Sequence, residues 1–79
     1  MSRLPAVTGR RMIRFLESLG FQVSRQHGSH IFLRHPDGRT ATVPVHAGEV
    51  LGRGLQQKIL HDAEASRQDF LDWQAKKQS

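Results

Sequence analysis

The sequence predicts a small α+β domain in which helices cover the apolar face of one three-stranded antiparallel sheet, in the order helix, three strands, helix. Helical apolar patterns over about residues 9–19 and 54–64 flank three alternating apolar segments that are joined by glycine turns. A chain of 79 residues is long enough for one domain, and we expect residues 1–79 to form it. Its core is expected over about residues 8–64, followed by a short helical tail over about 66–77.

The first helix is expected to begin after Thr8, a favourable N-cap, and to stop at Gly20, a favourable C-terminal glycine. One face is apolar at helical spacing and consists of Met12, Ile13, Leu16 and Leu19. The other face is basic and consists of Arg10, Arg11 and Arg14. This basic face is either a surface for an anionic partner or an ordinary solvated helix face.

The loops between the three strands predict the register of the sheet. Both connections fit a three-residue hairpin loop that ends in a left-handed glycine. A loop at 36–38 pairs Ile31 with Val43, and a loop at 26–28 pairs Val23 with Ile31. The alternating apolar residues of the three strands then fall on one face, with Phe32 on the other, whereas a two-residue second turn would divide the alternating apolar residues between both faces.

The same register predicts which side chains share the solvent-facing side of the sheet. Ser24, His30 and Pro44 are expected side by side, with His46 diagonal to His30. Pro44 cannot donate a hydrogen bond to a neighbouring strand, which favours an edge position for the third strand.

Two helical segments are predicted after the strands. The apolar residues from Leu55 to Ala63 repeat at helical spacing. Ser66 is a candidate N-cap for the tail, and we expect its Phe70 and Trp73 to lie in the core or in a partner contact.

Positive charge is concentrated in the first three quarters of the chain. Residues 1–58 hold nine basic and three acidic side chains, whereas residues 59–79 hold three basic and four acidic ones. Eight of the nine early cations are arginine, which suits bidentate contact with phosphate. A nucleic acid is therefore the expected partner, and a basic surface for solubility or for an acidic protein is the alternative.

Composition excludes several kinds of site. The chain has no cysteine, so disulfides, thiolate metal sites and thiol nucleophiles are excluded. A metal site could use only the histidines His27, His30, His35 and His46. His27 is expected in a loop and His35 on the opposite face from His30, with no carboxylate at ligand spacing, so we expect no metal and no cofactor. The N-terminus has no long apolar run, and we expect a cytoplasmic protein without membrane contact.

His30 is the main candidate for catalysis. Histidine exchanges a proton near neutral pH, so His30 is either a general acid or base acting on RNA or an exposed strand residue without a role. His46 is either a second proton-transfer group or phosphate contact, or a tolerated strand-end residue. The candidate RNA contacts are Arg10, Arg11, Arg14, Arg25, Arg34, Gly28 and Ser29.

Four segments in order resemble the HicA toxin family over about residues 8–71. They are Leu-Gly-Phe at 19–21, Arg-Gln-x-Gly-Ser-His at 25–30, Pro-Val-His at 44–46 and Gly-Leu-x-x-x-Ile-Leu at 54–60. The resemblance implies a double-stranded-RNA-binding-like fold and the toxin of a type II toxin–antitoxin system. It also implies a metal-independent mRNA interferase that inhibits translation, with its catalytic histidine at His30, and a HicB-like antitoxin that covers the active site.

The chain departs from the family at one position, and two other functional classes stay open. Many relatives have a threonine at the start of the second helix, where this chain has Arg53-Gly54-Leu55, so we expect a weaker N-cap there. A non-catalytic double-stranded-RNA-binding module would use the same fold and basic helix. A protein-interaction module would instead bind an acidic partner through the basic face.

Overall fold

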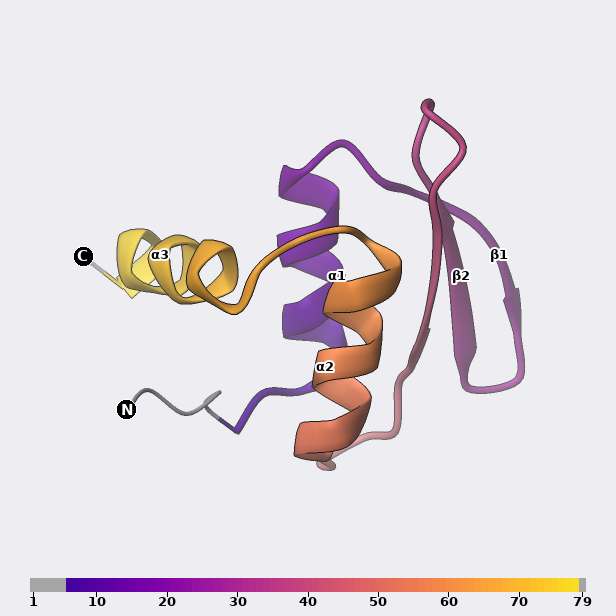
Figure 1. Ribbon diagram of the computed structural model, residues 1–79. Coiled ribbons are helices and arrows are strands. Elements are labelled where there is room, and N and C mark those ends of the chain that lie inside the picture. Colours follow the sequence, from indigo (N-terminus) through magenta and orange to yellow (C-terminus); the bar gives the residue numbers. More distant parts are fainter. Residues whose placement is uncertain (1–5, 79) are drawn as a thin grey trace.

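The computed structural model describes residues 6–78, which form an α+β fold around one antiparallel sheet (Figure 1). The elements in chain order are α1 Gly9–Ser18, β1 Gln22–His27, β2 His30–Arg34, β3 Thr40–Pro44, α2 Arg53–Asp62 and α3 Arg67–Gln78. The predicted arrangement of helix, three strands and helix, with a further C-terminal helix, is confirmed. Residues 1–5 and 79, which the expected domain includes, lie outside the described residues.

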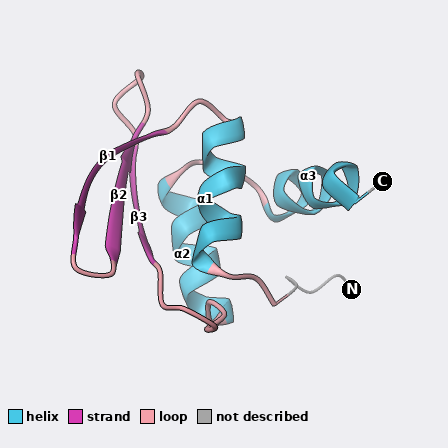
Figure 2. Cartoon of the chain, turned by 180° about the vertical axis from the view of Figure 1, so that it is seen from behind, coloured by secondary structure: helices cyan, strands magenta, loops and turns pink. Residues whose placement is uncertain are grey.

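The molecule has its sheet on one side and its helices on the other (Figure 2). Both α1 and α2 lie beside the sheet, and α3 lies beyond them on the side away from the strands. The strand order is β1-β2-β3, so Pro44 lies on an edge strand as predicted. The outer face of the sheet is therefore not covered by the helices.

The predicted limits and apolar face of α1 are confirmed. Thr8 is the N-cap, and its hydroxyl oxygen accepts a hydrogen bond of 3.2 Å from the backbone N–H of Arg11. Gly20 follows the helix with a φ of 104°, a left-handed conformation that favours glycine. The fully buried residues of this helix include Met12 and Leu16, which the pattern predicts, and Phe15.

The register of β2 and β3 is also the predicted one. Ile31 pairs with Val43, and both are buried on the inner face. The three-residue loop is closed by a 2.8 Å hydrogen bond from the His35 N–H to the Arg39 carbonyl. Gly38 ends that loop with a φ of 101°.

The predicted register of β1 and β2 is wrong. Val23 pairs with Leu33 rather than with Ile31, and a β-bulge at Ser24 shifts the pairing that follows. The connecting loop is the two-residue turn Gly28-Ser29, in which Gly28 has a φ of 60°. A positive φ at the first turn residue and not at the second corresponds to a type II′ turn.

The apolar pattern could not distinguish these two registers, because Val23 faces the helices in both. In addition, every residue of β1 is exposed, including Val23 at 48%. Weak burial of an edge strand leaves its register weakly specified by hydrophobicity. The bulge and the tight turn therefore set the pairing of β1 without a trace in the apolar alternation.

The two C-terminal helices complete the core. The N-cap of α2 is Gly52, which makes no side-chain capping hydrogen bond, so the expected weak cap is confirmed. Ser66 and Asp69 exchange two hydrogen bonds of 2.9 Å at the start of α3, which forms a capping box. Phe70 is fully buried, and its ring centroid lies 5.1 Å from that of Phe15 in an edge-to-face contact.

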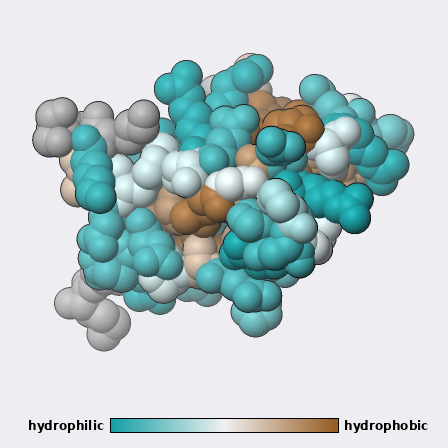
Figure 3. Space-filling view, turned by 90° about the horizontal axis from the view of Figure 1, so that it is seen from above, coloured by the Kyte–Doolittle hydropathy of each residue, from teal (hydrophilic) through white to brown (hydrophobic). Residues whose placement is uncertain are grey.

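The surface seen from above is mostly hydrophilic, with small hydrophobic areas between the polar side chains (Figure 3). None of the helices within residues 6–78 has the length and apolar character needed to cross a membrane.

Candidate active site

The outer face of the sheet presents two histidines and one proline in one row across the three strands. His30 on β2 pairs with Pro44 on β3, as the sequence predicts, and with His27 on β1. Directly paired residues of an antiparallel sheet point to the same face, so the two imidazoles are neighbours. Both histidines are exposed to solvent. The prediction that Ser24 lies beside His30 is wrong, because His27 occupies that position.

The two-residue turn makes His27, and not Ser24, the neighbour of His30. Ser24 is the extra residue, and its hydroxyl donates a 3.1 Å hydrogen bond to the carbonyl of Phe32. After an extra residue the alternation of side chains is reversed, so Arg25 and His27 point to the outer face. The prediction that His27 lies in a loop is therefore wrong, because it is the last residue of β1.

A cation and an aromatic ring form the next row of the same face. Arg25 pairs with Phe32, which pairs with Thr42 on β3. The guanidinium carbon of Arg25 lies 4.7 Å from the centroid of the Phe32 ring, which is a cation–π contact. Arg34 is exposed one row further along β2. The outer face thus combines two imidazoles, two guanidinium groups and one partly exposed ring.

The β1–β2 turn is held in place from both sides. The side-chain amide of Gln26 donates a 3.1 Å hydrogen bond to the carbonyl of Gly28. The backbone N–H of Val45 donates a 2.7 Å hydrogen bond to the carbonyl of Ser29. These bonds fix the backbone on either side of the turn, and with it the positions of His27 and His30.

His46 lies beside the turn. Its Nε2 is 3.5 Å from the hydroxyl oxygen of Ser29, and its side chain is exposed. Ser29 and Arg10 line one surface hollow, and Arg10 and His46 line another. The structure therefore brings His46, Ser29 and Arg10 together beside the N-terminal end of α1.

The arginines of α1 do not all face the same neighbours. Arg10 and Arg14 are exposed, whereas Arg11 is half-buried against α3. Its Nε donates a 2.9 Å hydrogen bond to the side-chain oxygen of Gln74, and its guanidinium carbon lies 4.9 Å from the centroid of the Trp73 ring. Part of the Arg11 guanidinium is thus engaged within the protein.

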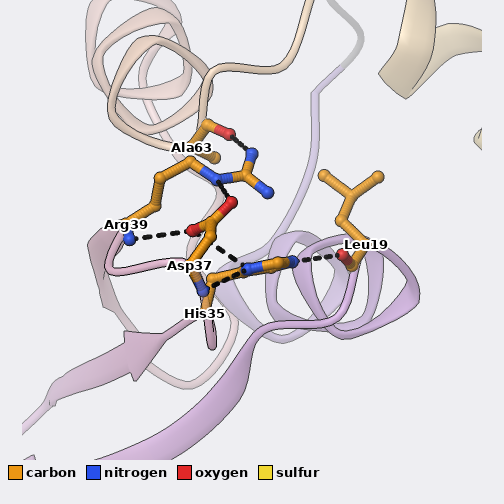
Figure 4. A network of polar contacts seen from close by, with 5 residues as sticks. All are labelled: Leu19, His35, Asp37, Arg39 and Ala63. Atoms are coloured by element: carbon orange, nitrogen blue, oxygen red, sulfur yellow. Dashed lines mark hydrogen bonds and ion pairs between the residues drawn. The ribbon is translucent and has the colours of Figure 1, made fainter.

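The β2–β3 loop contains a separate polar network that joins the sheet to the helix ends (Figure 4). His35 donates from Nε2 to the carbonyl of Leu19, the C-cap of α1, at 3.0 Å. Hydrogen bonding from the backbone N–H of Arg39 holds the pKa of the Asp37 carboxyl below its ordinary value, and the Arg39 guanidinium acts in the same direction. These residues are used by the fold, since their polar groups bind one another and the backbone.

Comparison with known proteins adds to this geometry. A family model described as the HicA toxin of bacterial toxin–antitoxin systems matches residues 9–65, which is more than half of the chain. The chain belongs to the HicA toxin family. A comparison with curated proteins gives no match.

Membership in the HicA family places the chain among the toxins of bacterial toxin–antitoxin systems, which are paired with a cognate antitoxin. The matched region runs from the start of α1 to just beyond α2 and includes the whole sheet. Both rows of the outer face lie within this HicA region, whereas α3 follows it.

The sequence analysis places Phe32 on the solvent-facing side without a role, and it does not predict the outer-face position of His27. Gly28-Ser29 is a signal that could have found His27, because a glycine in the first position suits a two-residue type II′ turn. That turn would have made His27 and His30 direct partners. The contact of Phe32 with Arg25 follows from the same turn, which makes these two residues cross-strand partners.

Proposed function

We propose that this protein is an endoribonuclease toxin that cleaves mRNA and thereby inhibits translation, with His30 in proton transfer. The observation that carries the proposal is the place of His30, exposed on the outer face of the sheet on the same side as Arg25 and Arg34. Membership in a toxin family supports it, since a toxin needs an essential target.

The residues of the outer face suit the chemistry of RNA cleavage. The reaction needs a group that accepts the proton of a ribose 2′-hydroxyl or donates one to the leaving oxygen, and an imidazole does either near neutral pH. Arg25 and Arg34 would stabilise the negative charge that develops on the phosphate. Phe32 offers a ring on which a base can stack. The mechanism needs no divalent ion and no organic cofactor.

The neighbouring residues would guide the RNA. Gly28 and Ser29 form the turn beside His30, and we assign their polar groups to phosphate contact. His46 has the same role at the other side of the turn, next to Ser29. Exposed Arg10 and Arg14 would continue the basic path along α1, and Arg11 would contribute only the part of its guanidinium that Gln74 and Trp73 leave open.

The partner protein is proposed to be a HicB-like antitoxin that covers the outer face. An antitoxin bound across β1, β2 and β3 would bury His30 and exclude RNA at the same time. Toxin and antitoxin would meet in the cytoplasm, where the mRNA target is found.

The test is degradation of RNA by the purified protein in the presence of a chelator, compared with His30→Gln and with His61→Gln as a matched control. His61 is an exposed histidine on α2, so the control removes an imidazole away from the outer face. We expect His30→Gln to lower the rate by about 10²- to 10⁴-fold, and His61→Gln to leave it unchanged.

Equal cleavage by the wild type and His30→Gln would refute the role of His30. Tight, salt-dependent RNA binding without any product, and without an effect of His30→Gln, would instead identify a double-stranded-RNA-binding module. Failure to bind RNA even at low salt would favour a module for an acidic protein.

A further inference from the structure

The second histidine of the row, His27, has no role in the function proposed above. We infer that His27 is a catalytic residue of the same reaction, and that His27 and His30 form an acid–base pair across the β1–β2 hairpin. The inference rests on the proposed ribonuclease activity and assigns that activity its second proton-transfer group.

The first argument is the position of the two histidines in the sheet. His27 and His30 are direct cross-strand partners on either side of the Gly28-Ser29 turn. Such partners have their Cβ atoms about 4.5–5.5 Å apart, so two imidazoles there can contact opposite sides of one phosphate group. The hydrogen bonds of Gln26 and Val45 hold the turn between them, which fixes the pair before substrate arrives.

Availability of the two rings is the second argument. Both side chains are exposed, and among residues 6–78 neither imidazole has a hydrogen-bond or ion-pair partner. A histidine that stabilised the hairpin through its ring would show such a partner, as His35 does with the carbonyl of Leu19. The rings of His27 and His30 are therefore free to bind a substrate.

The surroundings of the pair are cationic. On β1 the nearest charged residue of the same face is Arg25, and on β2 it is Arg34. On β3 the facing residues are Pro44, Thr42 and Thr40, which do not titrate. His46 lies 3.5 Å from Ser29, the neighbour of His30, and is not a cross-strand partner of His30. This arrangement favours His27 over His46 as the second proton-transfer group.

The reaction balances with two imidazoles alone. One neutral imidazole accepts the proton of the 2′-hydroxyl while that oxygen forms a bond to phosphorus. The bond from phosphorus to the 5′-oxygen breaks, and the second, protonated imidazole gives its proton to that oxygen. The products are a 2′,3′-cyclic phosphate and a 5′-hydroxyl, and one proton has passed from one histidine to the other.

The test compares His27→Gln, His27→Lys and His30→Gln, with His61→Gln as the control. The readout is the pH profile of kcat/KM on an oligoribonucleotide and on a ribonucleoside 3′-(4-nitrophenyl phosphate), whose leaving group departs without a proton. We expect a bell-shaped profile for the wild type and the loss of one limb in His27→Gln. The rate on the oligoribonucleotide should fall by about 10²- to 10⁴-fold.

The aryl substrate identifies which histidine is the acid. A His27→Gln enzyme that cleaves the aryl ester at nearly the wild-type rate supports the pair with His27 as the acid, and loss on both substrates supports it with His27 as the base. Lysine keeps a positive charge but exchanges its proton poorly near neutral pH. Restored activity in His27→Lys would therefore overturn the inference, because it would reduce His27 to a phosphate contact.

Failure of the inference about His27 can be distinguished from failure of the proposed function. If the wild type cleaves RNA, His30→Gln is inactive and His27→Gln keeps both limbs and the full rate, only the inference about His27 falls. If the wild type does not cleave RNA, both the proposed function and the inference about His27 are refuted. Circular dichroism and thermal unfolding of each variant separate loss of chemistry from loss of fold, and the exposure of His27 predicts wild-type unfolding for its variants.

Discussion

The guanidinium of Arg39, just before β3, donates a hydrogen bond to the backbone carbonyl of Ala63, the C-cap of α2 (Figure 4). The same side chain forms a 2.8 Å ion pair with Asp37, and its guanidinium carbon lies 5.2 Å from the centroid of the Phe21 ring. A cation at the C-terminal end of a helix meets carbonyl groups that lack partners within the helix. This arginine therefore joins the sheet to α2.

Replacement of Arg39 should destabilise the protein. We expect Arg39→Ala to lower the free energy of unfolding by about 1–3 kcal/mol, because a half-buried charged hydrogen bond to Ala63 is lost. Arg34→Ala, an exposed arginine on β2, should change it by less than about 0.5 kcal/mol. Urea denaturation of both variants measures the difference, and equal values would contradict a structural role for Arg39.

The capping box of α3 predicts a pH dependence of stability. The backbone N–H and hydroxyl of Ser66 donate to the Asp69 carboxylate and hold its pKa below its ordinary value. A carboxyl with a lowered pKa in the folded state stabilises the protein above its unfolded pKa of about 3.9, and this contribution is lost as the pH falls through the folded pKa. Asp69→Asn should therefore be less stable than the wild type at neutral pH, with a difference that disappears in acid. Thermal unfolding across this pH range measures it, and a constant difference would argue against the carboxylate.

Two helical glycines should respond to alanine in opposite directions. A methyl group at Gly9 would overlap the carbonyl oxygen of Pro44, where α1 approaches β3. A methyl group at Gly54 meets no atom within 4 Å, and alanine there favours the helix by about 0.5–1 kcal/mol. We expect lower stability for Gly9→Ala and higher stability for Gly54→Ala in the same denaturation experiment. A neutral Gly9→Ala would show that α1 can shift away from β3 at little cost.

RNA binding should depend on the stacked pair of the outer face. Arg25→Ala should weaken binding and reduce the slope of log affinity against log salt concentration by about one, because one phosphate contact is lost. Phe32→Leu should weaken binding with an unchanged slope, since stacking is lost without a change of charge. Lys58→Ala removes an exposed cation of α2 and serves as the control. Fluorescence anisotropy over a salt series tests this, and the same slope for Arg25→Ala and Lys58→Ala would contradict the expectation.

The β2–β3 hairpin could be predicted from the sequence because two independent signals agreed there. The apolar alternation of Ile31 and Leu33 against Ala41 and Val43 fixes one register, and the glycine of the loop fixes the same one. The limits of α1 were predictable for a similar reason, since its capping threonine and its apolar face give consistent limits.

The direction of Arg11 depended on tertiary contacts that no local pattern encodes. The direction of Arg11 is set by α3, and its partners Gln74 and Trp73 lie more than sixty residues away in the chain. The family motif makes His30 a candidate, whereas a three-residue loop would place His27, the residue before the glycine, outside the strand. The pairing of β1 shows that the two histidines are neighbours, as a two-residue Gly28-Ser29 turn requires.

The extra residue at Ser24 also affects how this chain is compared with its relatives. A relative with the same Gly28-Ser29 turn but without the bulge would keep His27 opposite His30 and would carry the residues before Ser24, such as Val23, on the opposite face. A gap-free alignment of two such sequences would match a helix-side valine of one with a solvent-side residue of the other. Position 23 should therefore be compared among relatives only after their strands have been superposed, because the amino-acid identity alone does not say which face it serves.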